Sequence, residues 1–148
     1  MKNKNKIYSK PFIKSLFWNQ NKWHAHGVFI HSIRVAWYAL RGKEYRMISA
    51  ALLHDIGKPY VAKKKGHGKE FFFLDHEECG YQIVKNWKIS SYTKKIIRYH
   101  YLIRDIKNSK KRDFIRYKRK KEVWSSLSED LQNDLKIFQV FDDKAKCL

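Results

Sequence analysis

The segment that decides the fold is Leu52-Leu53-His54-Asp55-Ile56-Gly57-Lys58-Pro59. An apolar run ends there in an adjacent histidine and aspartate, and a glycine and a proline then break the helix. A carboxylate at the C-terminal end of a helix gains nothing from the helix dipole, because that end is itself negative. An imidazole and a carboxylate placed together there make physical sense if a cation binds both of them. The segment therefore predicts a buried helix, from about residue 44 to 55, that ends at a metal-binding turn.

Two other apolar helices carry donors of the same kind. Segment 27–41 has apolar residues at helical spacing and contains His31, and Gly42 is expected to end that helix. A last helix, opened by Ser128 and running to about residue 146, contains Asp142 after an apolar run. We expect these three helices to bring four side chains to one ion: His31, His54, Asp55 and Asp142.

The remaining segments also predict helices. One is expected from a capping box of Asp75 and Glu78 to about residue 87, and another from Ser90 or Ser91 to about residue 104. A Lys- and Arg-rich segment, 107–121, is expected to form a solvated helix. No run alternates with period two, so we predict an all-α fold.

The ordered segments HSIRVA (31–36) and AALLHDIGKP (50–59), followed by a late aspartate, resemble the HD superfamily of metal-dependent phosphohydrolases. The motif of that family is His, then His-Asp, then Asp, and the four donors named above match it in order. Asp143 is the nearest alternative for the last ligand, but only Asp142 places Ala145 as the family pattern Asp-x-x-Ala requires. The resemblance implies a single bundle of five to seven helices over residues 23–148, after a basic leader of residues 1–22.

Two segments are similar to the HD domain of bacterial tRNA nucleotidyltransferases. These are Gln20-Asn21-Lys22-Trp23-His24 and Phe73-Leu74-Asp75-His76-Glu77-Glu78-Cys79-Gly80. We expect these 148 residues to hold no nucleotidyltransferase head besides the HD domain. What the likeness implies is an HD domain of the type that acts on phosphorylated nucleotides or RNA ends.

His76 and His100 extend the order of donors to His, His-Asp, His, His, Asp. This order resembles HD hydrolases with two metals, in which Asp55 would bridge the ions and His76 and His100 would bind the second one. Each histidine also has an ordinary alternative as a hydrogen-bonded or surface side chain. The identity of the divalent ion stays open among Mn, Fe, Ni, Mg and Zn.

Three basic groups are candidates for binding a substrate phosphate: Lys58, Arg34 and His24. Lys58 follows the His-Asp pair directly, and with Asp55 it is predicted to be catalytic, although a solvated helix-end lysine is the alternative. His26 and His67 are expected to face solvent. Lysines of the loop after Val61 form either a lid over an anionic substrate or a loop without such a role. The general acid stays open among Asp75, Glu77, Glu78 and Asp143.

Charge is the most unusual property of the 148-residue chain. Lys and Arg number 33 against 14 Asp and Glu, a formal charge of +19. Such an excess attracts polyanions, so contact with RNA or DNA through a basic surface is one interpretation, and the composition expected of an AT-rich genome is the other. Within segment 104–121, Phe114 and Tyr117 are expected to form the inward stripe of an amphipathic helix rather than stacking groups.

The leading hypothesis is hydrolysis of a phosphate ester or anhydride of a nucleotide or a nucleic-acid end. The alternative is a nucleic-acid-binding module whose HD site is structural or degenerate. Neither a signal peptide nor a membrane span is recognised, and Cys79 and Cys147 fit no disulfide or zinc spacing, so a cytoplasmic location is expected. The oligomeric state stays open.

Overall fold

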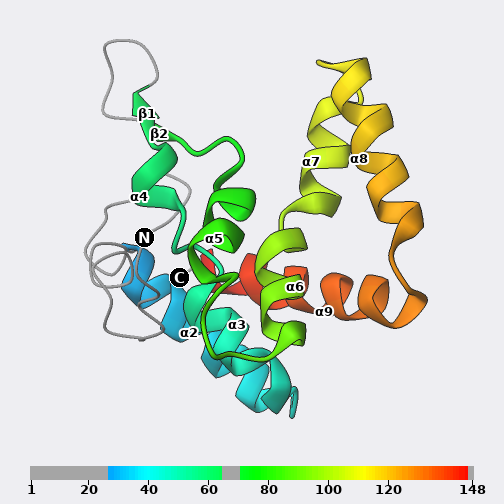
Figure 1. The fold of residues 1–148 in the computed structure, drawn as a ribbon. Helices are drawn as coiled ribbons and strands as arrows, with labels where there is room; N and C mark the ends of the chain where they lie inside the picture. The colour runs from blue at the N-terminus through cyan, green and yellow to red at the C-terminus, as the bar shows by residue number, and fades with distance from the viewer. Residues whose placement is uncertain (1–26, 65–70, 147–148) are drawn as a thin grey trace.

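A computed structural model describes residues 27–64 and 71–146 of the chain as helices packed into a bundle (Figure 1). The elements in chain order are α2 (Val28–Arg41), η1 (Tyr45–Met47), α3 (Ile48–Leu53), α4 (Lys58–Val61), β1 (Lys63–Lys64), β2 (Phe71–Phe72), α5 (His76–Val84), α6 (Ser91–Tyr99), α7 (Leu102–Ser109), α8 (Phe114–Ser126) and α9 (Glu129–Lys146). In the described ranges, six helices have eight residues or more. The predicted all-α fold is confirmed. One detail differs from the prediction of helices alone. The two-residue strands β1 and β2 pair antiparallel, with Lys63 opposite Phe72 and Lys64 opposite Phe71.

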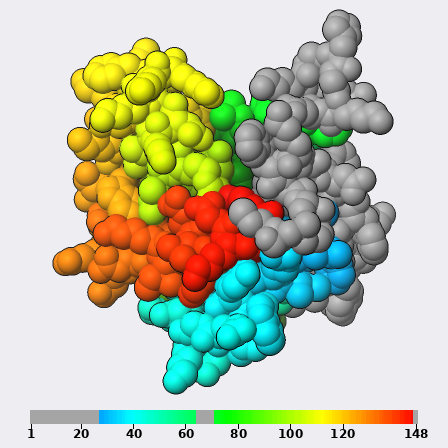
Figure 2. All heavy atoms as spheres, turned by 180° about the vertical axis from the view of Figure 1, so that it is seen from behind, coloured from blue at the N-terminus to red at the C-terminus, as the bar shows by residue number. Residues whose placement is uncertain are grey.

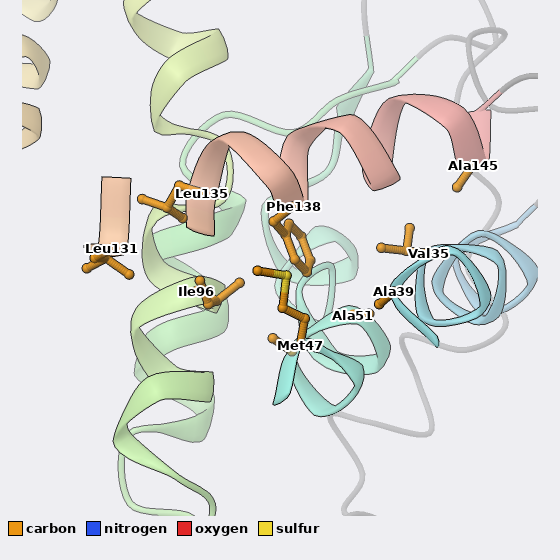
Figure 3. Close-up of a cluster of buried hydrophobic side chains, with 10 residues drawn as sticks. Val35, Ala39, Met47, Ala51, Ile96, Leu131, Leu135, Phe138 and Ala145 are labelled. Carbon is orange, nitrogen blue, oxygen red and sulfur yellow. The ribbon is translucent and has the colours of Figure 1, made fainter. Parts of the chain in front are cut away.

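The hydrophobic core lies where α2, α3, α6 and α9 meet (Figure 3). At its centre Phe138 of α9 and Met47 of η1 are fully buried, and their side chains point toward each other. Burying each large apolar side chain contributes about 1.5–3 kcal/mol. The ring of Phe138 also meets the ring of His54 edge-on, with centroids 5.5 Å apart. The core therefore supports the turn that carries the His-Asp pair.

Two glycines allow that turn to lie directly against the start of α5. A Cβ on Gly57 would lie 2.1 Å from the carbonyl oxygen of His76 and 2.6 Å from the amide nitrogen of Gly80. A Cβ on Gly80 faces Ile56 and Gly57 at ordinary contact distance. Only a residue without a side chain fits at position 57, and its backbone thereby sets the distance between Asp55 and His76.

The ends of the helices follow the sequence in part. The Ser90 hydroxyl accepts from the amide of Thr93 at 3.0 Å, and the last helix opens after Ser128, both as predicted. The first helix ends at Arg41, but the left-handed residue after it is Lys43 (φ 61°) and not Gly42. Gly42 serves close packing instead, because a Cβ there would lie 2.8 Å from the ring of Phe141.

Two predictions about helix ends are wrong. Asp75 precedes α5 but has φ 58° and no capping bond, because its carboxylate binds Arg116 instead. Glu78, the other half of the expected capping box, binds Arg98. The helix expected over residues 90–104 is broken at His100, and the chain continues as α7.

Helices α7 and α8 pack on each other and form an arm beside the rest of the bundle (Figure 1). Seen from behind, α9 crosses the molecule between this arm and α2 (Figure 2). No residue of α8 is buried, and Phe114 is 65% exposed. The prediction that the aromatic residues of this segment form an inward stripe is therefore wrong for Phe114. The inward positions hold Arg116 and Lys120, which bind carboxylates.

Candidate metal centre

The structure brings together all six residues that the sequence predicted as metal ligands. They come from five segments: α2, the turn after α3, the start of α5, the residue after α6, and α9. All six are buried: His31, His54, Asp55, His76, His100 and Asp142. Charged and polar groups are rarely buried unless they are paired or bind an ion. Such a cluster therefore requires a chemical explanation.

The backbone fixes the orientation of three of the histidine rings. The Nδ1–H of His54 donates to the carbonyl of Ala51, that of His76 to Phe73 and that of His100 to Ile97, each at 2.8 Å. A carbonyl only accepts, so Nδ1 carries a proton in each ring. The Nε2 atoms are thus the ones that face the other donors. This is the arrangement in which a histidine is held ready to bind a metal.

The first group of donors surrounds one oxygen of Asp142 and one of Asp55. His31 Nε2 donates to Asp142 Oδ1 at 2.9 Å and lies 3.8 Å from Asp55 Oδ2. His54 Nε2 lies 3.2 Å from Asp55 Oδ2 and 3.6 Å from Asp142 Oδ1, but no hydrogen bond of good geometry satisfies it. Donor atoms of His31, His54 and Asp142 lie within 4.8 Å of one another.

The second group surrounds the other oxygen of Asp55. Oδ1 lies 3.5 Å from His76 Nε2 and 3.8 Å from His100 Nε2, and the two Nε2 atoms are 3.2 Å apart. Because both rings donate through Nδ1, two nitrogen lone pairs face each other when the rings are neutral. That contact is repulsive unless a positive charge lies between them. The pair thus fits a cation that both nitrogens share with Asp55.

The carboxylates make this centre favourable for positive charge. Burial opposes ionisation of Asp55, but His54 and Lys58 beside it hold the pKa of that carboxyl well below its ordinary value. Burial likewise opposes ionisation of Asp142, whose pKa is held well below its ordinary value by the hydrogen bond from His31 and by the positive charges of Lys146 and His54. Burial also lowers the pKa of His54, yet the Asp55 charge outweighs it and raises that pKa to about 9.

The other histidines respond in the opposite direction. Burial lowers the pKa of His76 and of His31, and burial together with the neighbouring His54 and His76 lowers the pKa of His100 well below its ordinary value. Neutral imidazole is the form that binds metals. The donor set consists of imidazole nitrogens and carboxylate oxygens, and this set is suited to first-row divalent ions. The residues present therefore fit a divalent metal.

Two basic residues that sequence reasoning missed hold the outer oxygen of Asp142. Arg104 donates to Oδ2 at 3.0 Å and Lys146 at 2.8 Å, while Oδ1 faces the histidines. Lys146 is four residues after Asp142, a helical spacing that signals an ion pair, whereas nothing in the sequence pointed to Arg104. The neighbouring Asp143 is exposed and binds the same two cations from outside the cluster. The structure thus places Asp142, and not Asp143, among the donors.

Lys58 differs from the solvated lysine that was its alternative. It is 5% exposed, its Nζ lies 2.7 Å from Asp55 Oδ2, and the ring of Phe73 lies 5.5 Å away. Arg34 is half-buried on α2, one turn after His31, and its approach to a phosphate stays a prediction. His24, and with it His26 and His67, lies outside the described residues.

The four candidates for the general acid differ in their surroundings. Asp75, Glu78 and Asp143 each bind an arginine at the surface. Glu77 is buried, with Oε1 3.2 Å from Lys120 Nζ and Oε2 3.5 Å from His76 Nδ1. Glu77 therefore lies nearest to the cluster as an outer neighbour of His76.

A third acidic group has a different character. Asp75, Glu77 and Asp105 lie close enough to hold an ion. Arg116 already donates two hydrogen bonds to Asp105 and one to Asp75, and Lys120 lies 3.0 Å from Asp105. These two cations offset most of the charge of the three carboxylates and attach α8 to α5 and α7.

Comparison with known proteins places this geometry in a family. Residues 28–144 match the sequence model of the HD domain. The chain belongs to the HD domain family. No curated protein and no solved structure matches it. The HD domain covers every helix from α2 nearly to the end of α9, so all six donors lie inside it. Among the described residues no helix is long and apolar enough to cross a membrane.

Proposed function

We propose that the protein is a metal-dependent phosphohydrolase that cleaves a phosphate ester or anhydride of a nucleotide or of a nucleic-acid end. The observation that carries the proposal is the position of Asp55. Its Oδ2 faces His31, His54 and Lys58, and its Oδ1 faces His76 and His100. One carboxylate thus lies between two sets of nitrogen donors, as a bridge between two divalent ions requires.

Divalent ions bound by these six residues would supply Lewis acidity, which polarises a phosphoryl oxygen and lowers the pKa of water. The protein's own part is to hold the donors still. Carbonyls of the backbone fix three imidazoles, and Arg104 and Lys146 hold Asp142 by its outer oxygen. Side chains fixed in this way need no rearrangement when a charged substrate arrives.

Lys58 is the group we assign to the substrate. Its ammonium lies beside Asp55 in a buried position, where water screens charge weakly. A phosphoryl oxygen bound by a divalent ion that Asp55 holds would therefore lie near Lys58, which would offset the negative charge that grows during bond cleavage. Arg34 and His24 are the further phosphate contacts that we propose from the sequence.

The likeness of segments 20–24 and 73–80 to tRNA nucleotidyltransferase HD domains supports nucleotides and RNA ends as the substrate class. The alternative is a nucleic-acid-binding module whose HD site is structural or degenerate. A degenerate site would lack at least one donor, and the presence of all six donors in one buried cluster speaks against that form. A structural site would keep all six donors, and the absence of turnover would distinguish it from an enzyme.

The proposal is tested by phosphate release in the presence of Mn, Ni, Fe or Mg. The substrates are nucleotides, dinucleoside polyphosphates, cyclic phosphates and 3′-phosphorylated RNA. Asp55→Asn should abolish turnover, whereas Asp143→Asn, a neighbouring exposed carboxylate on α9, should retain most of it. Native protein that carries metal and hydrolyses none of these compounds, or Asp55→Asn protein with native turnover, would reject the proposal.

A further inference from the structure

The α7–α8 pair carries a large share of the positive charge of the chain. Within residues 107–121 nine Lys or Arg stand against the single acid Asp113, a net +8 of the chain's +19. We call residues 107–121 the basic arm. Its cations belong to the α7–α8 pair, which lies at one side of the bundle (Figure 2). The phosphohydrolase chemistry proposed above makes no use of them.

Structural roles account for only two of the nine cations. Arg116 and Lys120, one turn apart on α8, point inward and bind the cluster of Asp75, Glu77 and Asp105. The other seven have no carboxylate within ion-pair distance in the part of the chain that the structure describes. They are all exposed: Lys107, Lys110, Lys111, Arg112, Lys118, Arg119 and Lys121. Like charges placed this close destabilise the fold, so their concentration requires a reason beyond folding.

Aromatic rings lie among these unpaired cations. Phe114 is 65% exposed and stacks on Tyr117 with centroids 6.1 Å apart and planes at 28°. Lys118 lies over the ring of Phe114 and Lys121 over that of Tyr117. α8 has no buried residue, so this face is not the back of a packed helix. Tyr117 is half-buried, so Phe114 is the outer ring of the pair. Accessible aromatic rings flanked by cations are the groups with which proteins bind unpaired bases and their phosphates.

We propose that the outer face of the basic arm binds single-stranded nucleic acid. The exposed lysines and Arg112 contact phosphates, and the rings of Phe114 and Tyr117 stack on bases. A second copy of the chain is a poor occupant, because two +8 arms repel each other. An anionic membrane is also a poor occupant, because the exposed large apolar residues of α8 are only Phe114 and Ile115, and both lie in its first turn.

The test is fluorescence anisotropy of a labelled 20-nucleotide oligouridylate with hydroxyl ends, titrated with the full chain at several KCl concentrations. Hydroxyl ends remove the phosphomonoester that the enzyme proposed above would act on. We expect binding that weakens steeply with salt. The variant Lys111→Gln/Lys118→Gln/Lys121→Gln should weaken binding at least tenfold at 100 mM KCl and reduce the slope of log K against log salt by about 2.

A matched control removes the same charge elsewhere. Three exposed lysines outside the arm serve for this: Lys88 just before α6, Lys95 on α6 and Lys136 on α9. Their triple Gln variant should bind nearly as the native chain does. Phe114→Ala should weaken binding about tenfold with an unchanged salt slope, because it removes stacking and no charge. Circular dichroism of each variant verifies that the helices are retained.

Three results would overturn the proposal. The first is no binding of oligouridylate at 100 mM KCl. The second is an equal loss of affinity in the two triple lysine variants. The third is binding to phosphatidylserine vesicles that depends on Phe114, while oligouridylate binding does not depend on it. The Asp55→Asn variant should bind the oligonucleotide as the native chain does. The failure of this proposal and the failure of the proposed enzyme are therefore distinguishable.

Discussion

Single side chains in the metal centre are oriented mainly by backbone carbonyls. In His54, His76 and His100 the Nδ1–H donates to the carbonyl three residues earlier. Each of these residues lies at a helix end or start, where such a carbonyl is accessible to a side chain. The tautomer is therefore set by local structure, and the Nε2 atoms are directed to Asp55 before any ion arrives.

Lys58→Met separates charge from packing at this site. Methionine fills a similar volume, so the fold should persist, whereas the ammonium beside Asp55 is lost. We expect kcat to fall by about 10²- to 10³-fold, as when one electrostatic donor is removed from an active site. Metal content, measured by mass spectrometry, should be retained. Lys88→Met, at an exposed position, is the control, and native kcat in Lys58→Met would remove this lysine from the mechanism.

The sequence allowed prediction of the six donors because their types and order form a motif. The contact of Arg104 with Asp142 was not predictable, since it joins α7 to α9 and the start of α7 was itself not predicted. The sequence also left Lys58 open between two roles, because burial depends on the tertiary packing of Phe73 and α5. The neighbours of the six donors that lie outside the motif are therefore less predictable than the donors themselves.

At the scale of elements, the contact between the His-Asp turn and α5 decides the spacing of the donors. Gly57→Ala places a methyl group 2.1 Å from the carbonyl of His76, where only backbone surrounds it. The backbone angles of Gly57 suit alanine, so the cost is steric alone. We expect a loss of about 3 kcal/mol in the free energy of unfolding, measured with urea.

Gly42→Ala is the control for this substitution. Its added methyl meets the far end of the Phe141 ring, which can turn away. The loss should therefore be smaller than for Gly57→Ala. Equal stability losses in the two variants would show that the turn and α5 tolerate separation.

The attachment of α8 is expected to depend on pH. Arg116 and Lys120 lower the pKa of Asp105 against the opposing effect of burial. A carboxyl with a depressed folded pKa stabilises the protein above its unfolded pKa of about 3.9, and this contribution is lost as the pH falls through the folded value. Asp105→Asn should therefore cost about 2 kcal/mol at pH 7 and progressively less between pH 5 and pH 3.

Urea unfolding at both ends of that pH range measures the difference. Asp113→Asn, at an exposed position before α8, should show a smaller cost at pH 7. A cost for Asp105→Asn that is the same at pH 3 and pH 7 would contradict the ion-pair assignment.

Helix positions were predictable where local chemistry decided them. The ends of α2 and α9 and the Ser90 cap follow from short-range signals. The capping box at Asp75 failed because a distant residue, Arg116, offers that carboxylate a stronger, charged partner. The break at His100 was equally hidden, and at this point the buried His100 ring lies against that of His54, with centroids 5.0 Å apart.

At the scale of the whole molecule, the donors join segments from the first described helix to the last. An ion bound by them would connect α2, the turn after α3, α5, α6 and α9, and it binds the folded chain only. Ligand present at about 100 times its Kd adds about 2.7 kcal/mol to stability. The metal is therefore expected to stabilise the entire bundle.

Removal of the metal should lower the melting temperature. Dialysis against a chelator should reduce Tm by about 5–10 °C, and manganese should restore it. The Asp55→Asn variant should show little response to either treatment. A native protein whose Tm is the same with and without chelator would indicate that these donors do not hold a metal in the folded chain.

Metal stoichiometry is the measurement that tests the shared-carboxylate site most directly. Native protein, Asp55→Asn and Asp143→Asn are loaded with manganese, dialysed, and analysed by elemental mass spectrometry. Two ions per chain are predicted for the native protein and for Asp143→Asn, and fewer than one for Asp55→Asn. A native chain that holds one ion or none, or an Asp55→Asn variant with native metal content, would contradict the central role of Asp55.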